Sequence, residues 1–255
     1  MINDAINYPI EGDQTSDILL VGGVLSIISG ILAAIFLLLS VFTFGLGFIL
    51  MPLAFIPSLG IMGYYVRVLE STVDGGSEPP AFDDIAGAFK DGLVATAIGV
   101  VYYLIPSVLF LVAALFGGVL GGAAGNNGGG ALALLFLIGG GGLATVLTIA
   151  LTYVYPAALT RYATTDDIAA AFAFSDLIDT IGSIDYLVAW LYGLAILLVG
   201  GIVASIVGLI PLLGWLAAPV IQFLAAISAY RAWGLAYNAG TEATSQGDVD
   251  TTATV

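Results

Sequence analysis

Apolar residues along this chain form three long stretches that contain no charged residue. The stretches cover Ile18 to Val66, Gly92 to Thr160 and Tyr186 to Tyr230, and they are 49, 69 and 45 residues long. A helix crosses about 30 Å of hydrocarbon with about 20 apolar residues, so each stretch accommodates two membrane-spanning helices and a turn. The surplus of the middle stretch falls in the glycine-rich segment from Gly117 to Gly130, which is typical of a turn. The pattern predicts an all-α integral membrane bundle of three helical hairpins.

Three hairpins give six transmembrane helices. We expect them near Ile18–Phe42, Leu46–Val68, Leu93–Phe116, Ala131–Ala158, Ile184–Val207 and Leu213–Tyr237. The second helix contains Pro52 and Pro57 in its outer half. Residues 45–57 therefore form either part of a full span or a re-entrant or irregular segment that protein or water covers. The transmembrane domain then occupies residues 18–237. It follows a cytoplasmic N-terminal segment of residues 1–17 and precedes a disordered acidic tail of residues 238–255.

Every charged residue lies between or beside the apolar stretches, in residues 1–17, 67–91, 161–185 and 231–255. Each hairpin returns the chain to its starting side, so these four segments are expected on one face of the membrane. The basic residues in them are Arg67, Lys90, Arg161 and Arg231. Because cytoplasmic loops carry an excess of Lys and Arg, this face is predicted to be cytoplasmic. We therefore expect a multi-pass protein of the cell membrane with both termini in the cytoplasm.

Acidic residues outnumber basic residues by 18 to 4, and the net charge is −14. Self-repulsion of this size destabilises a compact protein in dilute buffer and is tolerated where molar salt shortens the Debye length to about 3 Å. The composition is typical of a halophilic archaeon, and the acidic clusters are interpreted as hydrated surface rather than cation sites. No basic patch is present to neutralise a phosphate backbone, so nucleic acid is not expected as a partner.

Catalytic chemistry has little support in the sequence. The chain has no histidine and no cysteine, which removes imidazole bases, thiol nucleophiles and nearly all zinc or haem ligation. The expected spans also lack the mid-membrane charges that proton relays and most ion-coupled transporters carry. Paired aspartates such as Asp83 and Asp84 could hold Mg²⁺, but no phosphate clamp or base of shifted pKa accompanies them. We expect no enzymatic activity, no metal and no cofactor.

The two longer charged segments share a string, which reads D-D-I-A-G-A-F at residues 83–89 and D-D-I-A-A-A-F at residues 166–172. The identity indicates descent from a repeated hairpin, with coincidence as the alternative. Apolar residues near both strings fall at helical spacing and predict short interfacial helices within the cytoplasmic segments 70–91 and 162–183. Their apolar faces are expected to present Phe82, Ile85, Phe89, Ile168 and Phe172. These helices either seat the following span as elbows or bind a partner or lipid.

Three arginines occupy equivalent positions if the hairpins are repeats, because Arg67, Arg161 and Arg231 lie at the cytoplasmic ends of the second, fourth and sixth spans. Three guanidinium groups gathered near the inner headgroups would bind a phosphate-bearing lipid bidentately. They are therefore candidate contacts for an anionic lipid. Alternatively, each arginine reaches the interface alone or pairs with a nearby acid such as Glu70.

Small residues repeat at helical spacing in two of the expected spans. The repeats are Ser26, Gly30 and Ala34 in the first span, and Gly200, Ala204 and Gly208 in the fifth. Small side chains let membrane helices approach closely, so these stripes either hold the bundle together or join it to a membrane-protein partner or a second copy.

Several strings carry a family resemblance. They are Tyr8-Pro9, Gly63-Tyr64-Tyr65-Val66-Arg67-Val68-Leu69, Pro79-Pro80-Ala81-Phe82-Asp83-Asp84 with Phe89-Lys90-Asp91-Gly92-Leu93, and Tyr103-Leu104-Ile105-Pro106. These strings resemble the archaeal membrane family of domain of unknown function 4013, mainly through G-Y-x-x-R-V-L followed by P-x-F-D-D. The resemblance is clearest from Tyr8 to Pro106. It implies a polytopic archaeal membrane protein and brings no activity and no site residues.

Taken together, these features predict a non-enzymatic membrane assembly, scaffold or lipid-binding component. Its expected partners are membrane lipids and, through the small-residue stripes, a membrane protein or a second copy. The rival function is a passive channel or carrier for a small neutral or weakly polar solute. A continuous polar stripe at helical spacing would favour the carrier, and the Ser, Thr and Tyr residues of the spans are scattered instead.

Overall fold

The computed structural model describes residues 2–123 and 129–252, and within these ranges the chain is helical and contains no strand. The chain divides into two compact units. Unit 1 comprises Met1–Thr96 and Pro156–Val255, and unit 2 comprises Ala97–Tyr155. Every charged residue of the sequence belongs to unit 1, so unit 2 consists of uncharged residues alone.

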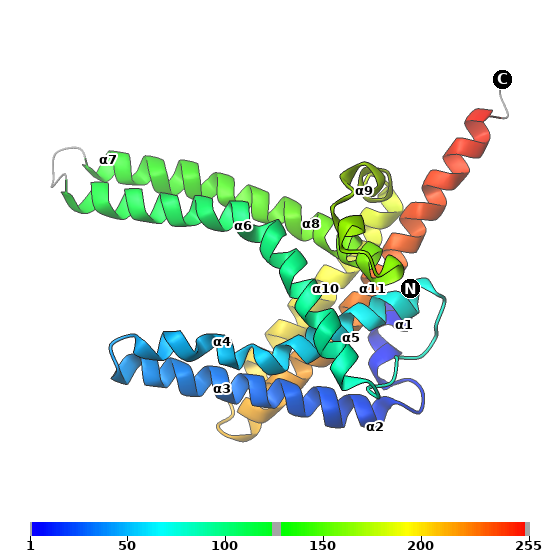
Figure 1. Ribbon diagram of the computed structural model, residues 1–255, viewed down its shortest axis with the longest axis horizontal. Helices are drawn as coiled ribbons and strands as arrows, with labels where there is room; N and C mark the ends of the chain where they lie inside the picture. Colours follow the sequence, from blue (N-terminus) through cyan, green and yellow to red (C-terminus); the bar gives the residue numbers. More distant parts are fainter. Residues whose placement is uncertain (1, 124–128, 253–255) are drawn as a thin grey trace. The chain divides into compact units, whose positions relative to one another are not determined.

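Helices of very different length build the two units (Figure 1). Those lying within unit 1 are α1 (Ile2–Asn7), η1 (Tyr8–Ile10), α2 (Thr15–Asp17), η2 (Ile18–Gly22), α3 (Gly23–Phe42), η3 (Leu46–Leu50), α4 (Met51–Ala54), α5 (Ile56–Val73), η6 (Ile168–Phe172), α9 (Phe174–Ile181), α10 (Ile184–Val207) and α11 (Leu213–Thr252). The helices α6 (Ile85–Ala123) and α8 (Gly141–Thr165) pass through the boundary between the units, and unit 2 also contains α7 (Gly129–Leu134) and η5 (Leu135–Gly140).

Five helical stretches among the described residues are long and apolar enough to cross a membrane. They are Thr15–Phe42, Ile85–Val119, Leu135–Thr165, Ile184–Val207 and Leu213–Ala243. Only 6% to 39% of the most apolar part of each stretch is buried inside the protein. The remaining apolar surface would be costly to expose to water, and lipid is the environment that accommodates it. The chain is thus an all-α, multi-pass membrane protein.

The expected second span is broken into three helical pieces. The pieces η3, α4 and α5 follow one another, and Phe55 separates α4 from α5. Pro52 and Pro57 each occupy one of the first two positions of a helix, where the missing N–H removes no helical hydrogen bond. All three pieces lie against α3 (Figure 1), which covers the irregular backbone. Of the two alternatives for residues 45–57, the structure shows the irregular segment. A sixth full span stays a prediction.

The helix α11 is at the centre of unit 1. It packs along α10 and also contacts α5, α3, α9 and α1 (Figure 1). Its inward face carries the large residues Phe223, Ile227 and Trp233, separated by buried alanines. Because lipid tails are as apolar as these side chains, close packing rather than removal from water holds membrane helices together. The alternation of large residues with alanine allows such packing.

Both predicted small-residue stripes are used in contacts with α11. On α3, a carbon added at Gly30 would lie 3.4 Å from the ring of Pro219. On α10, a carbon added at Gly200 would overlap the side chain of Ala225. The stripes therefore contribute to packing within unit 1, and a role in joining a partner or second copy stays a prediction.

The closest helix crossing in the charged part of unit 1 joins α5 to the start of α6. A carbon added at Gly63 would overlap the carbonyl oxygen of Ala88, and one added at Gly92 would overlap the carbonyl oxygen of Leu59. Glycine has no Cβ and lets two backbones approach this closely. The crossing places the first turns of α6 beside the charged end of α5.

The two predicted interfacial helices differ in structure. In the first segment, α6 runs without a break from Ile85, so residues 85–91 are the opening turns of a span rather than a separate elbow. These turns lie against α5, because Ala88 and Gly92 face that helix at close range. In the second segment, η6 and α9 form separate short helices, and Gly182 ends α9 before α10 begins.

The last helix extends beyond its predicted end at Tyr237. The α11 helix continues to Thr252, through residues that were predicted to be a disordered tail. The side chain of Asn238 donates a hydrogen bond to the carbonyl oxygen of Val73 (3.3 Å), so contact with α5 supports the first turn of this extension. The correction applies to residues 238–252, and residues 253–255 lie outside the described part of the chain.

Unit 2 places the second part of α6 beside α7, η5 and the first part of α8 (Figure 1). The hydroxyl groups of Tyr103 and Thr152 lie 3.3 Å apart, and the rings of Phe116 and Phe136 stack with centroids 5.6 Å apart. The predicted turn at Gly117–Gly130 includes residues 124–128, which lie outside the described residues. Unit 2 thus pairs uncharged helical stretches, and their arrangement as a hairpin stays a prediction.

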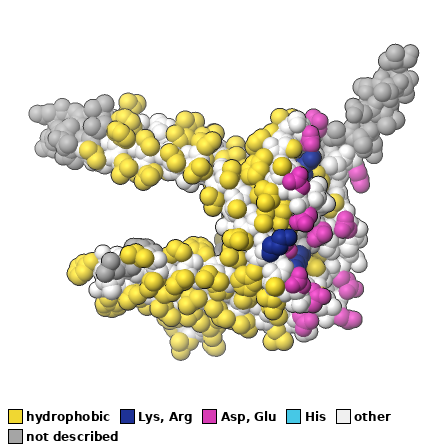
Figure 2. All heavy atoms as spheres, viewed as in Figure 1, with side chains coloured by type: hydrophobic (Ala, Val, Ile, Leu, Met, Phe, Trp, Pro, Cys, Tyr) yellow, Lys and Arg dark blue, Asp and Glu magenta, His cyan; other side chains and the backbone are white. Residues whose placement is uncertain are grey.

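The described charged side chains of unit 1 gather at one end, while hydrophobic side chains cover the surface away from it (Figure 2). We name this end the charged layer and define it by residues 4–17, 67–91, 161–185 and 231–242. Its segments touch one another: the hydroxyl of Tyr8 donates to the carbonyl oxygen of Glu78 (3.0 Å), and Arg231 pairs with Asp4. The four segments that the sequence places on one side thus form one layer within unit 1.

Candidate functional site

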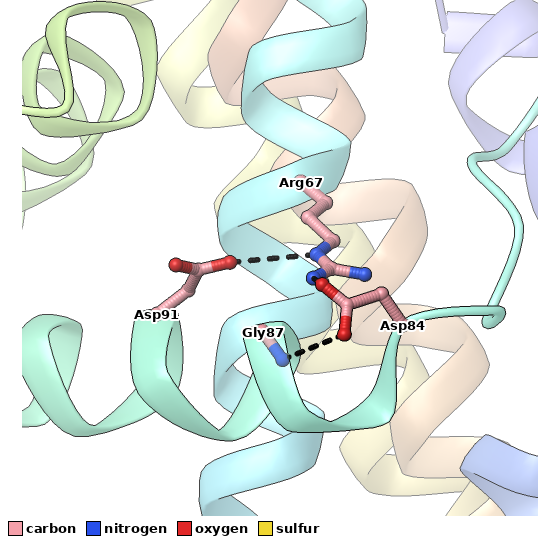
Figure 3. A network of polar contacts seen from close by, with 4 residues as sticks. All are labelled: Arg67, Asp84, Gly87 and Asp91. Atoms are coloured by element: carbon pink, nitrogen blue, oxygen red, sulfur yellow. Dashed lines mark hydrogen bonds and ion pairs between the residues drawn. The ribbon is translucent and has the colours of Figure 1, made fainter.

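The first group of predicted site residues is the set of three arginines in the charged layer. The first of them, Arg67, lies on α5 and pairs with two aspartates. Its Nη2 lies 3.0 Å from a carboxylate oxygen of Asp84, and its Nε lies 3.4 Å from Asp91 (Figure 3). Asp84 directly precedes α6, and its other oxygen accepts a hydrogen bond from the N–H of Gly87 (2.9 Å). Asp84 therefore caps α6 and also ties it to α5.

The backbone N–H of Gly87, followed by the hydrogen bond and charge of Arg67, lowers the pKa of Asp84 below its ordinary value. Its carboxylate is thus ionised at any pH near neutral, as both of its roles require. Arg67 has Glu70 one turn away on its own helix, which the sequence offers as one example of a nearby acid. It pairs with α6 instead, because the crossing at Gly63 brings both aspartates within reach.

Arg161 and Arg231 have their own partners. Arg161 on α8 lies 2.8 Å from Asp176 of α9. Arg231 on α11 lies 3.2 Å from Asp4, donates to the carbonyl oxygen of Gly76 (2.6 Å) and stands 4.5 Å above the ring of Tyr8. Each guanidinium is thus engaged by a different aspartate.

These pairings bear directly on the predicted lipid contacts. The side chain of Arg231 is 8% exposed and is enclosed by the N-terminal segment, so it is not accessible to a lipid phosphate. Arg67 and Arg161 are 17% and 21% exposed, and their aspartate partners already supply the negative charge that a phosphate would bring. The structure therefore supports the alternative in which each arginine pairs with an acid.

The predicted interfacial residues do not share one environment. Phe82 is buried and stacks on Tyr64 with ring centroids 4.4 Å apart, so it is a core residue rather than a membrane-facing one. Phe89 is half-buried against Gly60 of α5. Ile85 and Ile168 are exposed, and Phe172 is half-buried in η6. Helical spacing alone missed this because residues 80–84 form a loop that turns Phe82 inward.

A second site, which the sequence did not reveal, is a groove of about 470 Å³ between α3, α5, α11 and the start of α6. Its lining combines large apolar residues with five uncharged polar residues. The polar residues are Ser26, Ser29, Ser58, Thr96 and Gln222, and the others are Phe55, Leu59, Ile61, Met62, Tyr65, Pro219 and Phe223. We name it the polar groove.

The polar groove lies at membrane depth. Ser58 is nine residues from Arg67 along α5, and Gln222 is nine residues from Arg231 along α11. At 1.5 Å per residue both are about 13 Å from the charged layer, which is close to the middle of hydrocarbon about 30 Å thick. Polar groups are costly at this depth unless they find partners, so their gathering in one groove requires an explanation.

The polar groups of the groove differ in how well they are satisfied. The hydroxyl of Ser58 donates to that of Ser29 (3.2 Å), and Ser26 and Thr96 donate to backbone carbonyl oxygens of their own helices (both 2.7 Å). The side chain of Gln222 is exposed and makes no hydrogen bond with the described residues. An amide has two donors and an acceptor, so Gln222 offers hydrogen bonds to whatever occupies the groove.

An aromatic cluster closes the groove toward the charged layer. Tyr65 stacks on Tyr230 with centroids 4.6 Å apart, and its ring also lies 6.0 Å from that of Phe223. The hydroxyl of Tyr230 contacts the sulfur of Met62 at 3.8 Å. This cluster separates the polar groove from the arginines, so the two regions are chemically distinct.

The lining of the groove carries few groups that take part in acid–base chemistry. Tyr65 is its one lining residue with an ionisable side chain, so it provides neither an acid–base pair nor a charge for an anionic group. The described residues also contain no group of three or more carboxylates that could hold a metal ion. The arrangement fits a neutral group that both donates and accepts hydrogen bonds, such as a hydroxyl or an ester.

The sequence contained a partial signal for this groove. Ser26 and Ser29 lie on one face of α3, and Gln222 is an amide within a span, where such residues are uncommon. Ser58 and Thr96 come from two other helices, so no single-helix stripe connects the set. Only the packing of four helices gathers the scattered polar residues.

Comparison with known proteins adds a family but no activity. No curated protein and no solved structure was found to match the chain. The family described as "Protein of unknown function (DUF4013)" matches residues 46–212, which is well over half of the 255 residues. The match includes the strings around Arg67 and Asp84 and does not include Tyr8-Pro9. The chain therefore belongs to the DUF4013 family.

Proposed function

We propose that this protein is a non-enzymatic, lipid-binding component of the membrane and that the polar groove is its lipid site. The observation that carries the proposal is Gln222, whose amide is left unsatisfied at membrane depth beside the hydroxyls of Ser29 and Ser58. A lipid is the ligand most concentrated at this depth. Its ester, ether or hydroxyl groups match the uncharged donors and acceptors of the groove.

The surroundings of the groove favour entry from the side. Phe55, which lines the groove, is 63% exposed and belongs to the irregular segment between α4 and α5. An opening bordered by exposed apolar residues faces hydrocarbon rather than water. The absence of a cation among the lining residues disfavours a phosphate at this depth, so a neutral part of the lipid should occupy the groove.

Native mass spectrometry tests this proposal on protein purified from its own membrane. Wild-type protein is expected to retain one lipid, and Gln222→Leu is expected to lose it while remaining folded. Ser205→Ala is the matched control, because Ser205 is an exposed serine of α10 that lies outside the groove. Retention of the same lipid by Gln222→Leu at wild-type stoichiometry would refute the groove as the lipid site.

The same groove supports a second candidate, a passive carrier for a small neutral solute. The hydroxyls and the amide of the groove come from several helices and provide polar contacts that no single helix offers. Light scattering by liposomes distinguishes the two candidates, because a carrier would speed glycerol entry in a saturable manner and a lipid-binding protein would not. Flux that Gln222→Leu reduces and Ser205→Ala preserves would establish the carrier.

We further propose six spans with both termini in the cytoplasm of a halophilic archaeon. Support comes from the single charged layer, its four basic residues and the net charge of −14. Because the chain has no cysteine, Ser77→Cys in the charged layer and Leu209→Cys in the turn between α10 and α11 can each be labelled alone. An impermeant thiol reagent should label only Leu209→Cys in intact cells, and the reverse pattern would invert the orientation.

A further inference from the structure

The N-terminal segment is packed against the spans rather than free in solution. Both α1 and η1 contact α11, and each contributes a fully buried residue, Ala5 from α1 and Tyr8 from η1. Arg231 holds the segment from within α11 through its ion pair with Asp4 and its position over the ring of Tyr8. The hydroxyl of Tyr8 extends this connection to Glu78. These contacts of Arg231 with Asp4 and Tyr8 fix residues 2–10 in place, and we name them the latch.

The outward face of this segment is apolar. Ile2, Ile6 and Ile10 follow one another at four-residue intervals and are 41%, 51% and 61% exposed. Four-residue spacing places side chains on one side of a helical segment. The other exposed residues of the segment, Asn3 and Asn7, are polar. The three exposed isoleucines would be unfavourable in water, and they match the apolar face of an interfacial helix.

These isoleucines form one wall of a second groove, of about 380 Å³. The other walls are Ala195, Ile196, Val199 and Gly200 of α10 with Leu224, Ala225 and Ser228 of α11. Ser228 is three residues from Arg231, and Leu224 lies one further turn along α11. The groove therefore starts just below the charged layer and extends about 10 Å toward the membrane centre.

The position and chemistry of this groove identify its occupant. Val199 in its wall is 60% exposed and belongs to a span, so the groove is continuous with the lipid-facing surface of α10. Apart from Ser228, its lining is apolar. A narrow apolar groove that runs inward from the headgroup level fits a hydrocarbon chain of a lipid.

We propose that residues 2–10 are an interfacial anchor, latched to α11 by Arg231, and that Ile2, Ile6 and Ile10 close a groove that holds a hydrocarbon chain from the leaflet on the charged side. This site is separate from the polar groove and does not depend on the proposed function. It also assigns a role to Arg231, which positions the anchor instead of contacting a lipid phosphate.

Site-directed fluorescence on protein in liposomes tests the anchor. A single environment-sensitive probe is attached at Ile6→Cys, with Asn7→Cys as the control because Asn7 is exposed but does not line the groove. Lipids that carry a quencher on their chains should quench the Ile6 probe at least about twofold more than the Asn7 probe. Equal quenching at both positions would refute the anchor. A blue-shifted Ile6 probe that lipid does not quench would mean that protein covers this face, which also refutes the proposal.

Two further variants test the groove and the latch in the presence of the Ile6→Cys probe. Val199→Trp should fill the groove and reduce quenching, whereas Val203→Trp, one turn away and outside the lining, should not. Asp4→Asn removes the ion pair with Arg231 and should also reduce quenching in protein that remains monodisperse. Unchanged quenching in Val199→Trp would exclude a chain in the groove, and unchanged quenching in Asp4→Asn would exclude the latch.

Discussion

The charged layer and the polar groove both contain polar side chains from distant parts of the chain. The two regions differ in whether these side chains have partners within the protein. In the charged layer, Arg67, Arg161 and Arg231 each meet an aspartate of the same chain. In the polar groove, Gln222 meets no partner among the described residues. A buried guanidinium without a counter-charge lowers the free energy of unfolding far more than a neutral amide without a hydrogen-bond partner does. We therefore assign the arginine pairs a structural role and propose the groove as the place for a ligand.

The largest effect is expected from Arg231→Met, which removes the central cation of the charged layer. It leaves Asp4 and the carbonyl of Gly76 without their donor, and loss of a buried partner of this kind costs about 3 kcal/mol. Arg161→Met should cost less, about 1 kcal/mol, because its ion pair is more exposed. Thermal unfolding in detergent, followed by tryptophan fluorescence, measures both. Similar losses in the two variants would contradict the central role of Arg231.

The second prediction concerns the glycine crossing that connects the two regions. Gly63→Ala should destabilise the protein by about 2 kcal/mol, because the added carbon overlaps the carbonyl of Ala88 and forces α5 and α6 apart. The same shift should weaken the Arg67–Asp91 pair. Gly141→Ala in α8 is the matched control, since open space surrounds Gly141. Equal unfolding temperatures for the two alanine variants would show that the crossing tolerates a side chain.

The third prediction has the opposite sign. Gln222→Leu removes an unsatisfied amide from membrane depth, so the ligand-free protein should become more stable by up to about 1 kcal/mol. Chemical unfolding of delipidated protein measures the change against wild type. A clear destabilisation would indicate that Gln222 serves the fold, and the contrast between the two regions would then fail.

The smallest effect is expected at Glu70 in the charged layer. Partial burial of its carboxyl, and then the charges of Asp74 and Asp91, raise the pKa of Glu70 above its ordinary value, although Arg67 opposes them. The folded protein thus binds this proton more tightly than the unfolded chain does. The stabilising contribution is complete below the ordinary pKa of a glutamate and is lost as pH rises through the raised pKa.

Glu70→Gln stays neutral at every pH and should therefore stabilise the protein at pH 7. The gain should be a few tenths of a kcal/mol, because Glu70 as a whole is exposed although its carboxyl is partly desolvated, and solvent screens its interactions. Unfolding temperatures of wild type and variant, measured from pH 4 to pH 8, should converge at the acidic end. A variant that is less stable than wild type at pH 7 would show that Glu70 makes a favourable ionic contact instead.

The membrane class, the helical fold and the location of the charges could all be predicted from the amino-acid sequence. These properties follow from the length of the charge-free stretches, because the thickness of the bilayer is matched by consecutive residues of a single helix. The sequence also marked the weak second span through Pro52 and Pro57, since proline acts on the backbone of its own helix. The sequence pattern did not predict the continuous α6, whose first turns cross α5 closely. It also did not predict the extension of α11, whose first turn contacts α5 through Asn238.

The packing of the helices determines which polar side chains already have partners and which do not. Arg231 pairs with Asp4 across 227 positions of the sequence, and Phe82 turns inward because Tyr64 provides a ring to stack on. The polar groove likewise combines Ser29, Ser58, Thr96 and Gln222 from four helices. Helical periodicity describes one helix at a time, whereas ion pairs, ring stacking and grooves arise between helices. The candidate site of this protein therefore became visible only once the helices were packed.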